Sequence, residues 1–246
     1  MTATLLLTRP AQAAQDFASA ITATGWRGGV LVAPLMQIAY VPADLAVAAG
    51  AGTLVFTSHH GVAGWMGLGG ACNLPVWCVG PRTAQAARDA GFNDIRQAPG
   101  GDAVSLRAAL LAAQPARPVV HVRGAHAAMA LAQELDAAGL PAREVVVYDQ
   151  RPCDWTDAAR DLLSRPVPVV VPLFSPRSAR LFARACETLP QIRAQLHVIV
   201  ISSACVAALN ASKCSSLTVV DHPDGEAMRN AVLCMQAELE DNEKPR

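Results

Sequence analysis

The stretch Leu54–Gly91 has the sequence LVFTSHHGVAGWMGLGGACNLPVWCVGPRTAQAARDAG and contains one pattern twice. A short apolar run ends in polar or small residues, and a segment of helical pattern follows. Short apolar strands that alternate with helices indicate a parallel α/β sheet. Ligands of such sheets bind beyond the carboxyl ends of the strands. The residues that follow the two runs are therefore expected at a binding edge, beside helix N-termini that suit an anion; they are Thr57, Ser58, Gly80 and Thr83.

The same phrases return later in the chain. FTS at Phe56–Ser58 is matched by FSP at Phe174–Pro176. Near the start, TLLLTRP is matched by VVHVRG, which aligns Arg9 with Arg123. The spacing between matching phrases is nearly constant, and its small drift is what loops of different length produce. The sequence therefore predicts two related α/β halves.

Further elements follow from the apolar pattern and from turn residues. Strands are predicted at Thr4–Leu7, Val30–Ala33, Asp94–Gln97, Val119–Val122, Glu144–Tyr148, Val167–Leu173, His197–Ile201 and Leu217–Val220. Helices are predicted at Ala11–Thr24, Ala43–Gly50, Ala103–Ala113, Ala127–Ala138, Thr156–Ser164, Arg177–Thr188, Ala204–Asn210 and Glu226–Leu239. The charged end, Glu240–Arg246, is expected to be frayed.

Two extended, proline-flanked segments are too short to be domain elements. They are Leu35–Pro42 and Asp149–Pro152, and we interpret both as connectors. Two crossings of this kind are needed if the first strands and helices complete a domain that the last ones build.

Composition excludes several classes of protein. The formal net charge is zero, which argues against a broad nucleic-acid surface. No apolar run approaches the roughly 20 residues of a membrane span. The N-terminus has no basic segment, and Arg9-Pro10 interrupts its apolar start, so no signal peptide is expected. We therefore expect a cytoplasmic protein.

Seven cysteines are scattered without a C-x-x-C spacing, which is typical of reduced thiols in a cytosolic protein. A metal site needs clustered Cys or His ligands. The only histidine pair is His59-His60, and adjacent residues at a helix start are not expected to face one site. No metal site is predicted.

Several phrases spread over nearly the whole chain carry a resemblance when they are taken as a set. They are TRP (Thr8–Pro10), FTSHHGV (Phe56–Val62), VGPRTAQAARDAGF (Val79–Phe92), RG (Arg123-Gly124), VVVY (Val145–Tyr148), FSPRSA (Phe174–Ala179) and ISSACVAAL (Ile201–Leu209). In this order they resemble the uroporphyrinogen-III synthase family.

The resemblance implies an α/β fold of two flavodoxin-like parallel-sheet domains, joined by a two-stranded linker. One domain is discontinuous, with expected bounds 1–35 and 153–246. The other, 36–152, is inserted into it, with connectors near 35–42 and 148–152. The family cyclises the linear tetrapyrrole hydroxymethylbilane with inversion of ring D and loss of water. The resemblance implies that the substrate lies in the cleft between the domains, without a metal or an organic cofactor.

The resemblance also suggests roles for single residues. Tyr148 is the candidate general acid; alternatively it is a strand-end tyrosine that covers the core. Thr83 matches a cleft threonine and is also a candidate helix N-cap. Arg9 and Arg123 either face the cleft or pair with a nearby acid. Further candidate substrate contacts, which also cap helices, are Thr57, Ser58, Gly80, Ser175, Ser202 and Ser203. Arg82 and Arg177 are either solvated helix-start residues or substrate contacts.

Two features depart from the family pattern. The usual Gly-Pro-x-Thr phrase of the second half is replaced by Ser202-Ser203-Ala204-Cys205, which puts contacts from that loop in doubt. His59-His60 stands where small or amide residues are more frequent. Either the site is retuned or its activity is weakened.

Two other functions compete with the synthase. A non-catalytic two-lobed binder of small anions or tetrapyrroles has the same pattern. A nucleotide-dependent enzyme would need G-x-G-x-x-G after the first strand or a P-loop, and neither is present. For the synthase, expected partners are the substrate and, transiently, the deaminase that makes the bilane. Neither nucleic acid nor membrane is expected, and we expect a monomer.

Overall fold

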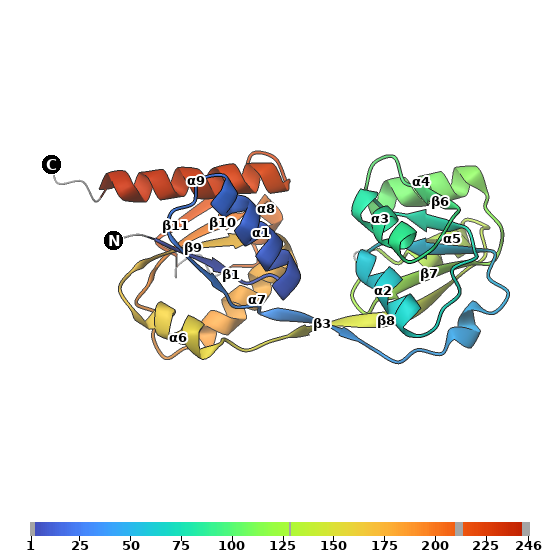
Figure 1. The fold of residues 1–246 in the computed structure, drawn as a ribbon, viewed down its shortest axis with the longest axis horizontal. Coiled ribbons are helices and arrows are strands. Elements are labelled where there is room, and N and C mark those ends of the chain that lie inside the picture. Colours follow the sequence, from blue (N-terminus) through green and yellow to red (C-terminus); the bar gives the residue numbers. More distant parts are fainter. Residues whose placement is uncertain (1–2, 128, 210–213, 243–246) are drawn as a thin grey trace. The chain divides into compact units, whose positions relative to one another are not determined.

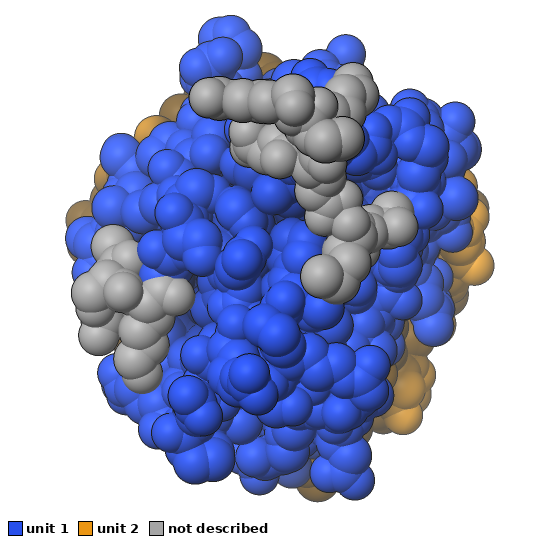
Figure 2. Space-filling model, turned by 90° about the vertical axis from the view of Figure 1, so that its left-hand side faces the viewer, with its two compact units in different colours: residues 1–37, 151–246 blue, residues 38–150 orange. Residues whose placement is uncertain are grey.

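The computed structural model describes residues 3–127, 129–209 and 214–242 (Figure 1). The chain divides into two compact units (Figure 2). Unit 1 consists of Met1–Gln37 and Arg151–Arg246, and unit 2 is Ile38–Gln150. Each unit is a mainly parallel sheet with helices on both faces, which confirms the predicted fold class.

Unit 1 contains a five-stranded sheet in the order β11-β10-β9-β1-β2. All of its paired strands are parallel. The strands are β1 (Thr4–Leu7), β2 (Gly29–Val32), β9 (Pro168–Leu173), β10 (Gln195–Val200) and β11 (Ser216–Val219). The helices are α1 (Ala11–Ala23), α6 (Asp157–Ser164), α7 (Pro176–Glu187), α8 (Ser203–Val206) and α9 (Gly225–Asn242).

The strands of this sheet are apolar on both faces because both faces are covered by helices. In β1, Leu5 and Leu7 pack with α1 and α9, whereas Leu6 packs with α6, α7 and α8. All three leucines are fully buried. The continuous apolar runs of the sequence are thus explained by burial on both sides.

Unit 2 contains a six-stranded sheet in the order β3-β8-β7-β4-β5-β6. The strands are β3 (Met36–Tyr40), β4 (Thr53–Phe56), β5 (Val76–Cys78), β6 (Ile95–Gln97), β7 (Val119–Gly124) and β8 (Ala142–Pro152). Its helices α2 (His59–Gly67) and α3 (Pro81–Asp89) cover one face. The helices α4 (Ala103–Ala113) and α5 (Leu131–Ala137) cover the other.

Both connectors are strand segments. β3 pairs with β8 at the edge of the sheet, and the predicted connector Asp149–Pro152 continues β8 without a break. Val41 N donates to Val147 O at 3.1 Å, and Cys153 N donates to Leu35 O at 2.9 Å. These two bonds show that the connectors run antiparallel to each other.

The predicted repeat agrees with the strand orders. Sheet order β11-β10-β9-β1-β2 in unit 1 corresponds to β6-β5-β4-β7-β8 in unit 2. In this correspondence β1 matches β7. Arg9 follows β1, and Arg123 lies near the end of the equivalent strand β7. Likewise β9 matches β4, so that Ser175 and Ser58 cap equivalent helices.

Several predicted helices differ in length from those observed. Residues 43–50 form only the short 3₁₀ helix η1 (Leu45–Ala48), and α5 begins at Leu131 rather than at Ala127. α8 ends at Val206; the rest of its predicted range reaches residue 210, which lies outside the described residues. The segment predicted to be frayed begins at Glu240, but α9 continues up to Asn242, so its first three residues are helical. Residues 243–246 lie outside the described part.

Two helices begin with capping boxes. Asp102 accepts from Ser105 N at 2.7 Å and begins α4, as predicted. Ser175 accepts from Ser178 N at 3.1 Å and begins α7. The cysteines are free thiols. Within the described ranges, no helix is both long and apolar enough to cross a membrane.

Candidate functional site

The carboxyl ends of β4 and β7 meet Tyr148 of β8 at a pocket of about 130 Å³ in unit 2. The pocket brings together three of the predicted site residues, Thr57, Arg123 and Tyr148. The other lining residues are Ala103, His121, Gly124, His126, Ala127, Met129 and Leu131. Polar groups therefore gather where ligands of parallel sheets bind.

His121 is a site residue that the sequence did not single out. It lies in β7, is 1% exposed, and its Nε2 is 3.0 Å from Thr57 Oγ1. Burial, and then the Arg123 charge, lower the pKa of His121 to about 4, while Glu144 acts in the opposite direction. The imidazole is thus neutral near pH 7. The available signal was one polar residue inside the apolar run VVHV, although such a residue is also common in ordinary strands.

Arg123 lines the pocket and also pairs with an acid. Its Nε donates to Glu144 Oε2 at 2.9 Å, and its Nη2 donates to Glu144 Oε1 at 2.6 Å. Nη1 donates to the carbonyl oxygen of Gly124 at 2.7 Å. The hydrogen bonds from Arg123 lower the pKa of the Glu144 carboxyl. Both of the roles expected for Arg123 are therefore compatible with its position, with most of its donors already engaged.

Tyr148 covers the core and borders the pocket at once. It is 5% exposed and packs in the cluster that includes Val122 and Val147. A Cβ atom on Gly124 would lie 2.5 Å from the Tyr148 ring, so only glycine allows this packing. The ring centroid of His60 is 5.6 Å from that of Tyr148. The two alternatives considered for Tyr148 thus do not exclude each other.

The two histidines at the start of α2 contact each other through their rings. Their ring centroids are 3.9 Å apart. Burial, followed by the charges of His59 and Arg82, lowers the pKa of His60 to about 4. Among the described residues, no group of three or more His, Cys, Asp or Glu side chains is placed to hold a metal ion.

Three other predicted residues lie at the starts of α2 and α3. Ser58 caps α2 by accepting from His60 N at 3.2 Å. α3 is capped by Gly80, with Pro81 at its first turn, so the prediction of Thr83 as an N-cap is wrong. Thr83 lies inside the first turn and is 5% exposed. None of the three lines the pocket of 130 Å³.

Unit 1 has a pocket of about 170 Å³ at the corresponding strand ends. Arg9 and Ser175 line it together with Thr8 and Phe174. The Arg9 guanidinium carbon lies 3.9 Å from the centroid of the Phe174 ring, a cation–π contact between two residues that line the pocket. Thr8 is 4% exposed, and its Oγ1 has no hydrogen-bond partner among the described residues. The pocket thus combines a cation, an unused hydroxyl and the N-terminus of α7.

Ser202 and Ser203 lie at the start of α8, away from both of these pockets. Ser202 makes no cap hydrogen bond, and its Oγ is 3.7 Å from Cys205 Sγ. Cys205 is buried in the core. At the position that departs from the family phrase, α8 thus begins with a weak hydroxyl–thiol contact and without a side-chain cap.

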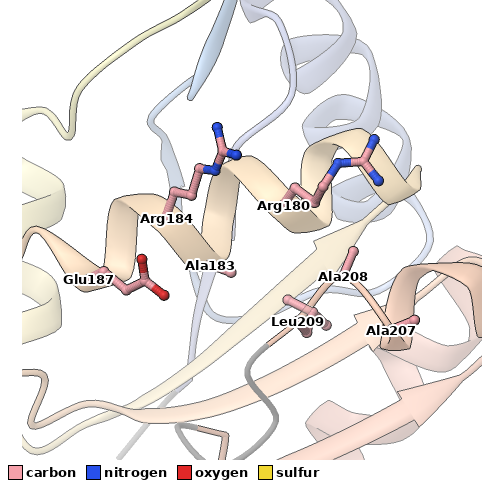
Figure 3. A pocket seen from close by; sticks show the side chains of 7 residues that line it. All are labelled: Arg180, Ala183, Arg184, Glu187, Ala207, Ala208 and Leu209. Atoms are coloured by element: carbon pink, nitrogen blue, oxygen red, sulfur yellow. The ribbon is translucent and has the colours of Figure 1, made fainter.

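A further groove of about 450 Å³ lies along α7 (Figure 3). Figure 3 shows Arg180, Arg184 and Glu187 on the helix, with Ala208 and Leu209 across from them. It contains no predicted site residue, so we do not include it in the candidate site.

The fold and the two strand-end pockets define a two-unit α/β protein, in which each pocket contains an arginine and at least one hydroxyl side chain. The model of the family described as "Uroporphyrinogen-III synthase HemD" matches residues 15–230. The chain belongs to the uroporphyrinogen-III synthase family, whose members are lyases of haem biosynthesis that act on a tetrapyrrole.

Solved structures show the same fold. The uroporphyrinogen-III synthetase of Helicobacter pylori 26695 aligns with a TM-score of 0.66 and 18% identity, over 95% of this chain and 99% of that chain. A mutant uroporphyrinogen III synthase of Thermus thermophilus aligns with a TM-score of 0.54 and 14% identity, over 97% and 99% of the two chains. No curated protein matches this sequence.

Proposed function

We propose that this chain converts hydroxymethylbilane into uroporphyrinogen III, with ring D inverted and one molecule of water lost. The observation that carries the proposal is the family match over residues 15–230. The strand-end pockets support it, because a substrate with many carboxylates needs donors and cations at several separate points.

The proposed chemistry begins with departure of the hydroxyl group from ring A. Tyr148 donates a proton to it, so that it leaves as water and a stabilised cation remains. Ring D attacks through its substituted carbon, a spiro intermediate forms, and it rearranges. The proton finally lost from the substrate returns to the Tyr148 phenolate. A general acid typically contributes about 10²- to 10⁴-fold, and orientation contributes up to roughly 7–11 kcal/mol.

The carboxylates of the substrate are proposed to bind at the strand ends of both units. In unit 1, Arg9, Ser175 and the free hydroxyl of Thr8 form one such site. In unit 2, Thr57 and Arg123 form another. Additional contacts are proposed for the helix starts at Ser58, Gly80, Thr83, Ser202 and Ser203.

The test is the product itself. Hydroxymethylbilane is generated in situ by a bilane-forming deaminase, this protein is added, and the oxidised porphyrin isomers are separated. Isomer III as the main product supports the proposal. Isomer I, the spontaneous product, contradicts it; if the protein then still binds uroporphyrin, the non-catalytic binder becomes the better description.

We further propose a cytoplasmic monomer that receives its substrate by transient contact with the deaminase. Size-exclusion chromatography with light scattering tests the monomer. Turnover in the coupled assay should exceed turnover of free, preformed bilane at equal concentration. Equal rates would contradict the handover.

A further inference from the structure

Thr57 and His121 both line the unit 2 pocket and are linked by one hydrogen bond. Thr57 Oγ1 and His121 Nε2 are 3.0 Å apart. His121 is neutral near pH 7 because burial and the Arg123 charge disfavour the imidazolium. One ring nitrogen therefore carries a hydrogen and the other does not.

The buried surroundings decide between the two tautomers. His121 Nδ1 is buried and has no hydrogen-bond partner among the described residues. A hydrogen on Nδ1 would leave a buried donor unsatisfied, and such donors are rare in folded proteins. A hydrogen on Nε2 is instead donated to Thr57 Oγ1, and only a lone pair on Nδ1 lacks a partner. The Nε2–H tautomer is therefore favoured.

The direction of this bond fixes what Thr57 offers to a ligand. Its oxygen accepts from His121, so its own hydrogen is available for donation. Thr57 is only partly buried and borders the pocket. The ionisable side chains that line the pocket beside Thr57 are Arg123, which is paired with Glu144, and His126, whose Nε2 is 3.5 Å from Asp149 Oδ1. A hydroxyl donor next to a guanidinium suits a carboxylate oxygen.

We propose that His121 is a positioning residue that makes Thr57 an obligatory hydrogen-bond donor to one carboxylate of the tetrapyrrole substrate. This inference rests on the proposed function for the identity of the ligand. Thr57 touches the substrate, and His121 acts through Thr57. Loss of either side chain should therefore weaken binding of the substrate by a similar factor.

Binding and kinetics test the coupling. For His121→Leu and Thr57→Val, the Kd of uroporphyrin III, measured by fluorescence titration, and the KM should each rise about fivefold to tenfold, the effect of one hydrogen bond. The kcat should change less than twofold. The double variant should be no worse than either single variant, since the two residues form one unit. His121→Gln, which keeps a donor near the Nε2 position, should recover most of the affinity.

A matched control is available in unit 1. His197 Nδ1 is 2.9 Å from Ser216 Oγ, and His197 Nε2 is buried without a partner among the described residues. This second histidine–hydroxyl pair lines neither strand-end pocket. His197→Leu should therefore leave the Kd of uroporphyrin III unchanged.

Nitrogen NMR reads the tautomer without any activity. In the free protein, Nδ1 of His121 should resonate as an unprotonated nitrogen and Nε2 as a protonated one, with the signals assigned by their loss in His121→Gln. The opposite tautomer would overturn the inference, as would additive effects in the double variant or an unchanged Kd in a folded His121→Leu protein. Because the titration and the spectrum need no turnover, a protein that yields only isomer I would refute the synthase proposal and leave this test readable.

Discussion

At the scale of single residues, Tyr148 is the group whose chemistry the reaction needs most. Tyr148→Phe should slow turnover by about 10²-fold or more, within the range of a general acid, but should not abolish it, because the bilane is intrinsically reactive and the rest of the site still orients it. The measurement is the initial rate of isomer III formation. The other tyrosine, Tyr40, is 55% exposed, and Tyr40→Phe serves as the control with an expected rate close to that of the parent. Complete loss of activity in a folded Tyr148→Phe protein would show that acid catalysis contributes more to the rate than expected.

Gly124 fixes the position of the Tyr148 ring. Gly124→Ala would bring a methyl group to within 2.5 Å of that ring, so one of the two must move. We expect a loss of about 1–3 kcal/mol in the free energy of unfolding and a lower rate, since overpacking displaces the tyrosine. Gly67→Ala in α2 is the control, because nothing lies within 4 Å of its new methyl group. Equal stability of the two variants in urea unfolding would contradict the close packing.

The buried imidazole of His121 should make stability depend on pH. Its pKa is about 4 in the folded chain and near 6.5 when unfolded, so the unfolded state binds more protons between these values. The stabilisation that the neutral His121 ring contributes is therefore fully present above about pH 6.5 and is lost as the pH falls toward 4. The corresponding loss in the free energy of unfolding is on the order of 3 kcal/mol. Urea unfolding at pH 7 and pH 5 measures the slope, which should be smaller in His121→Gln. An unchanged slope would mean that His121 is not buried as a neutral ring.

At the scale of helices and strands, the contribution of one helix N-cap to stability can be measured separately from the functional site. Thr156 begins α6 by accepting from Ala159 N at 3.2 Å. Thr156→Ala should cost about 1 kcal/mol of stability, the usual value for a lost N-cap. The control Thr22→Ala changes an exposed residue inside α1 and should be neutral or slightly stabilising, because alanine favours helix. A loss in the control as large as in Thr156→Ala would refute the capping role.

Strands were predictable from sequence because burial on both faces requires continuous apolar runs, as in Leu5–Leu7. Helix ends were less predictable. Residues 43–50 have a helical composition, yet they form only the 3₁₀ turn η1, since helical propensity is weak against tertiary packing. Thr83 was wrongly predicted as a cap because Pro81, which suits a first turn, places the helix start at Gly80.

The residues of the candidate site also differ in how well they could be predicted from the sequence. Thr57 and Arg123 were found in sequence because they follow or end predicted strands, where parallel sheets place ligands, whereas Tyr148 was suggested by the family resemblance. His121 was not, because it lies within β7 and its part in the pocket depends on its contact with Thr57. Whether a strand-interior histidine is merely buried or holds a neighbour in place depends on distances that a sequence does not contain.

At the scale of the whole molecule, unit 2 has its own sheet and its own core. We predict that a fragment of residues 38–150 folds alone and unfolds cooperatively. Circular dichroism and dispersed amide NMR signals measure this. The control is a fragment of residues 151–246, which lacks β1 and β2 and leaves the β9 edge unpaired. A disordered 38–150 fragment, or a folded control, would contradict the prediction and with it the domain boundaries proposed near residues 35–42 and 148–152.

The strand correspondence between the two sheets also holds along the chain. Along the chain, β1, β2, β4, β5 and β6 form a first series, and β7, β8, β9, β10 and β11 repeat it in the same order. Each sheet, however, takes two strands from one series and three from the other. This is the arrangement expected of a tandem duplication whose copies have exchanged segments, with β3 and β8 as the strands that cross between the units. A half-length ancestor carrying one series could have built the same two sheets as a segment-swapped homodimer, and fusion of its two copies would have made that exchange permanent.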